Sequence, residues 1–279
     1  MSWRDPAFSG GAKSPGFPPT PLFSFRQGAV LLSWRATVFA SRRAKGAPVP
    51  DRRFQKAASP LPPRAADPAI PERLVEAASL SEWIACACGG DASVAHVRIA
   101  GDAVEGADFA LLELSESRME GCSYAGCDFD RAMVSDVAFA GCDFSNSTFS
   151  QANFTRCTFS SCKFTGADFL EAVFSRVEVR DSTFAYASLA RGKLEDVSVV
   201  STDFSQADLT ELRQRRVRFD DVRFVGTSFF RTSLDGVDLS SCQLADIVLS
   251  DTMGELRGCS MDLFQAAGIA RRLGVNIKD

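Results

Sequence analysis

Histidine is almost missing from this 279-residue chain, because His96 is its only one. A catalytic or metal site that needs two imidazoles is therefore excluded. Long apolar runs are missing as well, and a membrane-spanning helix needs about 20 consecutive apolar residues, so a protein with such helices is excluded too. All 12 prolines lie at or before Pro71, so the chain changes character near that point.

The two parts of the chain also differ in charge. Residues 1–80 carry 12 Lys and Arg against 5 Asp and Glu, whereas residues 92–253 carry 15 against 25. Residues 1–70 combine Pro, Gly, Ser and Arg with little periodicity, which predicts a disordered basic leader. Three interpretations of this leader stay open: an organelle transit peptide, a nucleic-acid-binding tail, or upstream sequence that precedes the native start.

The acidic part has a period of five residues. From Val94 to Leu249, every fifth residue is large and apolar at 31 of 32 positions, and Gln214 is the exception. The residue two places earlier is Ala, Cys, Ser, Thr, Gly or Val at 28 of the 32 positions. This period fits neither a helix nor a strand, but it fits a square coil in which each five-residue unit makes one side and both apolar classes point inward.

Such a coil closes after four units, so residues 20 apart in sequence should stack. Stacking predicts two ladders of large side chains: Phe144, Phe164, Phe184, Phe204 and Phe224 on one wall, and Phe129, Phe149, Phe169, Leu189, Leu209 and Phe229 on another. Fifteen Phe occupy the large position, and each contributes about 1.5–3 kcal/mol when it is buried. Phenylalanine should therefore dominate the core.

Several units share the pattern Ala, then Asp or Asn, then Phe or Leu. Examples are Ala107-Asp108-Phe109, Ala152-Asn153-Phe154, Ala167-Asp168-Phe169 and Ala207-Asp208-Leu209. This motif resembles the pentapeptide-repeat protein family, and the chain is similar to its quinolone-resistance-type bacterial members. The resemblance implies an all-β solenoid, a right-handed quadrilateral β-helix of about eight coils over residues 91–254.

Both ends of a solenoid need caps, since the terminal coils expose apolar surface and unpaired strand edges. Pro71–Ala85 is predicted to be a short helix within a capping segment over residues 71–90. Asp262 and Gln265 predict a capping box that opens a helix within residues 255–279. This ending is similar to the C-terminal helix of bacterial pentapeptide proteins, which implies a homodimer; a cap on a monomer is the alternative. The candidate residues are Leu263, Phe264, Ala267, Ala270 and Leu273.

Little in the sequence points to catalysis. Six of the nine cysteines occupy the small inward position and are interpreted as free thiols of the core: Cys122, Cys127, Cys142, Cys157, Cys162 and Cys242. The pair Cys86 and Cys88 and the lone His96 are interpreted as structural. We therefore predict no catalytic residue, no metal site, no cofactor and no enzyme. Free thiols favour a reducing compartment, the cytoplasm, with an organelle as the alternative if the leader is a transit peptide.

Two surface sets remain as candidate partner sites. The candidate acidic surface consists of Asp108, Asp128, Asp143, Asp168, Asp203, Asp208 and Asp238, and the candidate basic patch of Arg213, Arg215, Arg216 and Arg218. The resemblance implies a DNA mimic that binds DNA gyrase or topoisomerase IV and protects it from quinolones. On that hypothesis the repeat domain binds neither nucleic acid nor membrane. The alternatives are a scaffold for an unknown partner and an organelle-targeted pentapeptide protein.

Overall fold

The structure is a computed structural model that describes residues 67–82 and 93–278. The chain divides into two compact units, residues 1–51 and 52–279, and all described residues belong to the second. The leader predicted over residues 1–70 thus lies outside the described residues except for its last four. The pair Cys86 and Cys88 also lies outside them.

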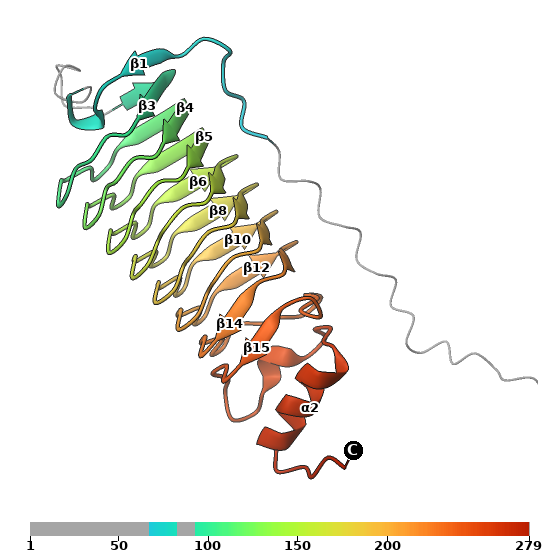
Figure 1. Cartoon of the computed structure of the whole chain (residues 1–279). Coiled ribbons are helices and arrows are strands. Elements are labelled where there is room, and N and C mark those ends of the chain that lie inside the picture. The colour runs from blue at the N-terminus through green and yellow to red at the C-terminus, as the bar shows by residue number, and fades with distance from the viewer. Residues whose placement is uncertain (1–66, 83–92, 279) are drawn as a thin grey trace, which may run out of the picture. The chain divides into compact units, whose positions relative to one another are not determined.

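Short parallel strands are the main regular elements of the described chain (Figure 1). In chain order the first seven are β1 Val75–Ala77, β2 Ser93–Ala95, β3 Val97–Ala100, β4 Glu113–Glu120, β5 Met133–Ala140, β6 Asn153–Thr155 and β7 Thr158–Ser160. The next eight are β8 Val173–Ser175, β9 Glu178–Arg180, β10 Lys193–Glu195, β11 Ser198–Val200, β12 Arg213–Arg215, β13 Arg218–Asp220, β14 Arg223–Val225 and β15 Gln243–Ala245. A 3-10 turn, η1 Gly254–Leu256, and one helix, α2 Leu263–Arg272, follow.

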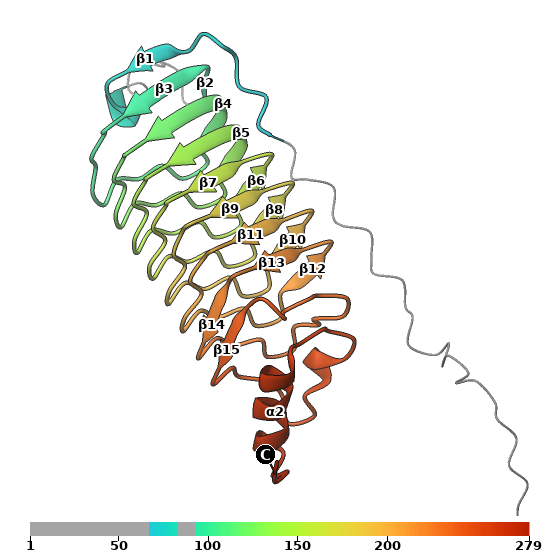
Figure 2. The same ribbon diagram turned by 45° about the vertical axis from the view of Figure 1, so that its right-hand side comes forward.

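The strands from β2 to β15 belong to coils of 20 residues, numbered here from coil one (residues 93–112) to coil eight (residues 233–252). Each coil has four walls, which in coil one are residues 93–95 (wall A), 98–100 (wall B), 103–105 (wall C) and 108–110 (wall D). Paired residues of successive coils are 20 apart, as in Phe154 with Phe174 and Phe159 with Val179. Figure 2 shows the two rows of strands that form walls A and B. This parallel stacking confirms the predicted right-handed quadrilateral β-helix.

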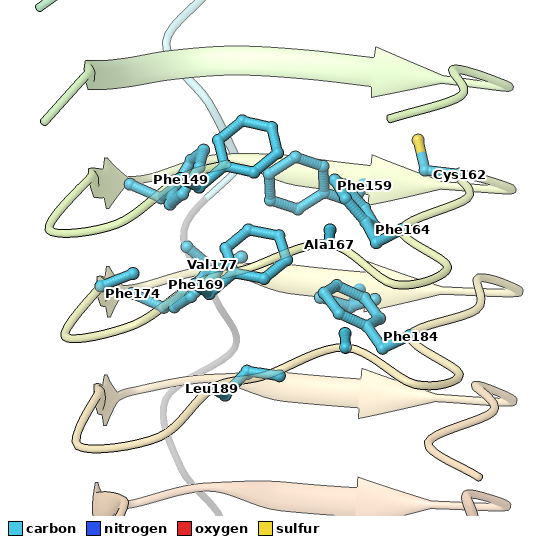
Figure 3. Packing of buried hydrophobic residues seen from close by; sticks show 14 of the residues in the cluster. Phe149, Phe159, Cys162, Phe164, Ala167, Phe169, Phe174, Val177, Phe184 and Leu189 are labelled. Carbon is cyan, nitrogen blue, oxygen red and sulfur yellow. The ribbon is translucent and has the colours of Figure 1, made fainter. Parts of the chain in front are cut away.

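The large side chains stack inside the coils in the predicted ladders. Phe164 lies parallel to Phe144, with ring centroids 5.3 Å apart, and its centroid is 4.6 Å from that of Phe184. Phe149 and Phe169 stack at 4.8 Å on a second wall, and edge-to-face contacts join the two ladders (Figure 3). Rings at these distances gain about 0.5–1.5 kcal/mol per pair beyond the burial of their area. The core is thus a continuous column of phenylalanines.

The corners of the coils explain the glycines that follow the large residues. Gly166, for example, has a φ of 69°, in the left-handed region. A Cβ at this position would lie 2.5 Å from Oδ1 of Asn146 in the coil before, so glycine also avoids a clash there.

The N-terminal cap differs from the prediction. A helix over Pro71–Ala85 is wrong for Val75–Ala77, which form β1 and pair in parallel with β3; helical conformation is present at residues 80–82. The free edge of the first coil supplies backbone partners that a helix could not use. Leu80, fully buried, then closes the apolar end of the core.

Candidate interaction surfaces

The acidic candidates divide between walls. Asp108, Asp128, Asp168 and Asp208 form one column on wall D, together with Thr148, Ser188 and Ser228. We call these four aspartates the wall D column; no Lys or Arg occurs at its positions in these coils. Asp143 and Asp203 lie on wall C, and Asp238 lies on coil eight beside Ser260. The structure thus brings four of the seven candidates together and separates the other three.

All seven aspartates also stabilise turns. The Oδ1 atom of each accepts a hydrogen bond from the backbone N–H two residues later, as in Asp168 with Leu170 N at 3.0 Å and Asp128 with Asp130 N at 2.8 Å. The other five are Asp108, Asp143, Asp203, Asp208 and Asp238. These hydrogen bonds hold the carboxylates in a fixed orientation. At Asp238, the hydrogen bond from the backbone N–H of Ser240 and, after it, the one from the Ser240 side chain lower the pKa of the carboxyl group.

The basic patch is largely neutralised within the chain. Arg215 pairs with Glu195 and Arg216 with Asp196, both in coil six, and Arg218 pairs with Asp220 at 2.7 Å. The hydrogen bond from Arg216 lowers the pKa of Asp196. In residues 67–82 and 93–278, Arg213 is the one member of the patch without an ion pair. Its backbone partner in β10 is Lys193, a residue of the same charge.

The C-terminal helix docks through polar side chains that the sequence interpretation did not single out for this role. The predicted capping box of Asp262 and Gln265 is present. Gln265 Nε2 also donates to Leu239 O at 2.8 Å and Cys242 O at 2.6 Å, and Arg272 Nη1 donates to Ile247 O. Cys242 O and Ile247 O are acceptors that a further coil would otherwise satisfy. The i, i+7 spacing of Gln265 and Arg272 could have indicated this face.

The apolar candidates of α2 mostly face outward. Leu263 is 80% exposed, Phe264 86% and Leu273 63%. Ala267 and Ala270 are half-buried. An exposed group of large apolar side chains on one helix is a typical feature of protein interfaces.

The cysteines and His96 occupy structural positions. The six predicted core cysteines are buried and free, and Cys259 is half-buried and free. Burial raises the pKa of Cys157 to about 12, which keeps this thiol protonated and unreactive. His96 contacts Glu116 at 2.8 Å on the surface. Among the described residues, no group of three or more His, Cys, Asp or Glu could hold a metal, and no helix is long and apolar enough to cross a membrane.

A buried carboxylate at the N-terminal end was missed by the sequence interpretation. Asp102 occupies a small inward position and is 8% exposed. Its Oδ2 accepts hydrogen bonds from Tyr124 Oη at 2.7 Å and from Leu80 N at 2.9 Å. Asp102 thus fastens the N-terminal cap to the first coils. Asp102 is the one charged residue at the inward positions of the register, and this exception could have indicated its special role from the sequence.

Comparison with known sequences supports the repeat assignment. Residues 132–203 match the family described as "Pentapeptide repeat region". The repeat domain is a pentapeptide-repeat β-helix. No curated protein matches this chain.

Solved structures of other pentapeptide proteins are similar to it. A trypsin-treated form of QnrB1, "a plasmid-mediated fluoroquinolone resistance protein", is 21% identical, with a TM-score of 0.45 over 67% of this chain and 99% of that one. HetL, a pentapeptide repeat protein "involved in heterocyst differentiation regulation" from the cyanobacterium Nostoc sp. strain PCC 7120, is 12% identical. Its TM-score is 0.27 over 62% of this chain and 92% of that one.

Proposed function

We propose that this pentapeptide-repeat protein is a non-enzymatic, protein-binding β-helix that presents wall D to the basic DNA-binding surface of a partner. DNA gyrase or topoisomerase IV is the proposed partner, and protection of that enzyme from quinolones is the proposed outcome. The wall D column is the observation on which the proposal rests, because it places carboxylates of fixed geometry in one line, on coils one, two, four and six.

The charge density of the column sets the expected strength of binding. Asp108 and Asp208 are five coils apart, which is roughly 24 Å at a strand spacing of roughly 4.8 Å. Four carboxylates over that length give about one charge per 8 Å, whereas one DNA strand carries a phosphate about every 3.4 Å. Wall D would therefore replace DNA only in part. Binding should weaken with salt, because exposed charges are screened.

Inhibition of gyrase supercoiling by the full chain, with and without ciprofloxacin, tests the proposal. The informative variant is Asp168→Asn with Asp208→Asn, since an asparagine Oδ1 still accepts the turn hydrogen bond while the charge is lost. We expect this double variant to lose most of the inhibition and of its salt dependence.

A second double variant, Asp143→Asn with Asp238→Asn, is the matched control. It removes two charges from the same kind of turn, but outside the wall D column. It should retain most of the inhibition. Equal loss in both double variants would remove wall D as the binding surface, and no inhibition by the wild-type chain at a large molar excess would remove the topoisomerase as partner.

We also propose that two copies associate through the exposed apolar side of α2. Phe264 and Leu263, 86% and 80% exposed, are the residues that association would cover. Analytical ultracentrifugation of the full chain should give a dimer that Phe264→Ser converts to monomer. Leu111→Ser, which changes an exposed leucine in coil one, is the control and should leave the dimer intact. A wild-type monomer at micromolar concentration would contradict this proposal.

The free thiols support a reducing compartment as the place of action, and we propose the cytoplasm. Fractionation of cells that express the full chain, with an antibody against the repeat domain, would test this location. Recovery of a shortened chain in an organelle would contradict it.

A further inference from the structure

The joint between coil seven (residues 213–232) and coil eight (residues 233–252) differs from the joint before it. Coil six is hydrogen-bonded to coil seven on all four walls, with β10 paired to β12 on wall A and β11 to β13 on wall B. Between coils seven and eight, wall C keeps the β14–β15 pair and wall D keeps Phe229 N to Val248 O at 2.9 Å. Within the described residues, β12 and β13 pair with no strand of coil eight, and the two rows in Figure 2 end there.

A side chain replaces the missing backbone bonds on wall A. At the preceding joint, Asp196 N donates to Arg215 O at 3.1 Å. The equivalent backbone bond from Arg216 to Asp235 does not form between these described residues. Instead, Gln214 Nε2 donates to Ser233 O at 3.2 Å and to Asp235 O at 3.4 Å. The one polar residue at the large position thus lies between the two coils and connects them.

The same side chain is less buried than its neighbours in the column. Leu194 in coil six and Leu234 in coil eight are buried at the positions equivalent to Gln214, whereas Gln214 is only half-buried. A surface recess of about 780 Å³ runs along the corner between walls D and A from coil four to coil eight, and Gln214 and Ser233 line it at this joint. Within the described residues, β12 and β13 therefore lack strand partners in coil eight at the point where the apolar register is interrupted.

The arginine cluster coincides with the two open strand edges. Arg213 and Arg215 belong to β12, Arg216 to the corner, and Arg218 to β13. An open edge pairs readily with other chains, and charged side chains on it prevent this association. The ion pairs of Arg215 and Arg216 run back to coil six. The arginine cluster therefore protects the unpaired edges of β12 and β13 from association with other chains.

We propose that this joint is a hinge with Gln214 as its latch. Coil eight, together with η1 and α2, turns about walls C and D, and walls A and B open further when the Gln214 amide releases the carbonyls of Ser233 and Asp235. The hinge sets the direction of α2 relative to coils one to seven. It does not depend on the identity of the partner.

Amide hydrogen exchange of the full chain, read by mass spectrometry, tests the hinge. Residues 213–221 should exchange about tenfold faster than residues 193–201, which occupy the same walls one coil earlier, because some of their amides have no backbone acceptor in coil eight; the motion of the hinge is read from the change that the Gln214 variants make to this rate. Gln214→Ala should accelerate exchange at residues 213–221 further. Gln214→Leu, which restores the apolar register, should slow it toward the rate of residues 193–201.

Gln206→Ala is the matched control, since it shortens a glutamine at a corner of coil six, where the following joint is hydrogen-bonded on all walls. It should leave exchange at residues 213–221 unchanged. Equal rates for residues 213–221 and 193–201 in the wild-type chain would overturn the hinge even if neither Gln214 variant folds. Faster wild-type exchange that neither Gln214 variant alters would overturn the role of Gln214 as latch.

Discussion

Replacing Phe164 with alanine should cost more stability than any single change on the surface of the coils. Phe164 is 1% exposed, stacks on Phe144 and Phe184, and makes edge-to-face contacts with Phe159 and Phe169. A buried Phe→Ala change costs about 3–5 kcal/mol. The total stability of a domain is about 5–15 kcal/mol, so this one change should remove a large share of it.

A two-variant series separates the burial of Phe164 from its ring contacts. Phe164→Leu keeps most of the volume but loses the stacked and the edge-to-face ring contacts, so we expect a loss of about 1–3 kcal/mol, smaller than that of Phe164→Ala. Urea unfolding of the full chain, followed by circular dichroism, measures both losses as shifts of the midpoint. Because coils contact only their neighbours, hydrogen exchange should accelerate most in coils three to five.

Phe230→Ala provides the comparison, since Phe230 is half-buried, faces outward and contacts Arg231 through its ring. Its cost should stay below about 1 kcal/mol. If Phe164→Ala cost no more than Phe230→Ala, the phenylalanine column would not be the main source of stability, and the argument from the five-residue register would fail.

Three further changes test the two caps and the corner ion pair. Gln265→Ala leaves two backbone carbonyls at the end of coil eight without their donor, so it should cost about 1–3 kcal/mol in urea unfolding. Asp102→Ala removes the acceptor of two buried donors and should open the N-terminal cap to limited proteolysis, whereas Asp102→Asn, whose Oδ1 still accepts, should protect it in part. The hydrogen bonds of Arg156 lower the pKa of Asp136, so their contribution to stability is present above the unfolded pKa of about 3.9 and is lost as pH falls through the folded value. The difference in Tm between the wild-type chain and Arg156→Gln should accordingly be full above pH of about 4 and shrink at lower pH.

The coils could be predicted from the sequence because their geometry repeats. Each inward position is set by its own residue and by residues 20 places away, so Phe149, Phe169 and Leu189 could be placed in one ladder without coordinates. The aspartates of the turns follow the same rule. A regular period therefore determines the walls, the core and the positions of the outward residues.

The caps could not be predicted in this way, because they depend on contacts outside the period. Ala69 N donates to Asp136 Oδ1 in coil three, and β1 pairs with the edge of coil one, so tertiary contacts replace the helix predicted over Pro71–Ala85. Gln265 was assigned only to the capping box, although its side-chain nitrogen also reaches two carbonyls of coil eight. Both differences arise where the stack ends and unpaired backbone groups need partners.

The open joint illustrates the same limit in the middle of the stack. Gln214 was recognisable as the one polar residue at the large positions, and the arginines beside it as an unusual basic run. Their connection was not recognisable, because the sequence does not tell which walls remain hydrogen-bonded.

The turn role of the aspartates changes how the acidity of the protein bears on its function. All seven candidate aspartates accept a hydrogen bond within their own turn, and three of them lie outside the wall D column. The acidic composition is thus partly a consequence of the turns, in which aspartates accept backbone hydrogen bonds, and it does not by itself indicate a DNA mimic. Folding does not require that aspartates line up on wall D, because Thr148 and Ser188 occupy equivalent positions there without a carboxylate. The variants that keep the turn and remove the charge are therefore the ones that separate partner binding from folding.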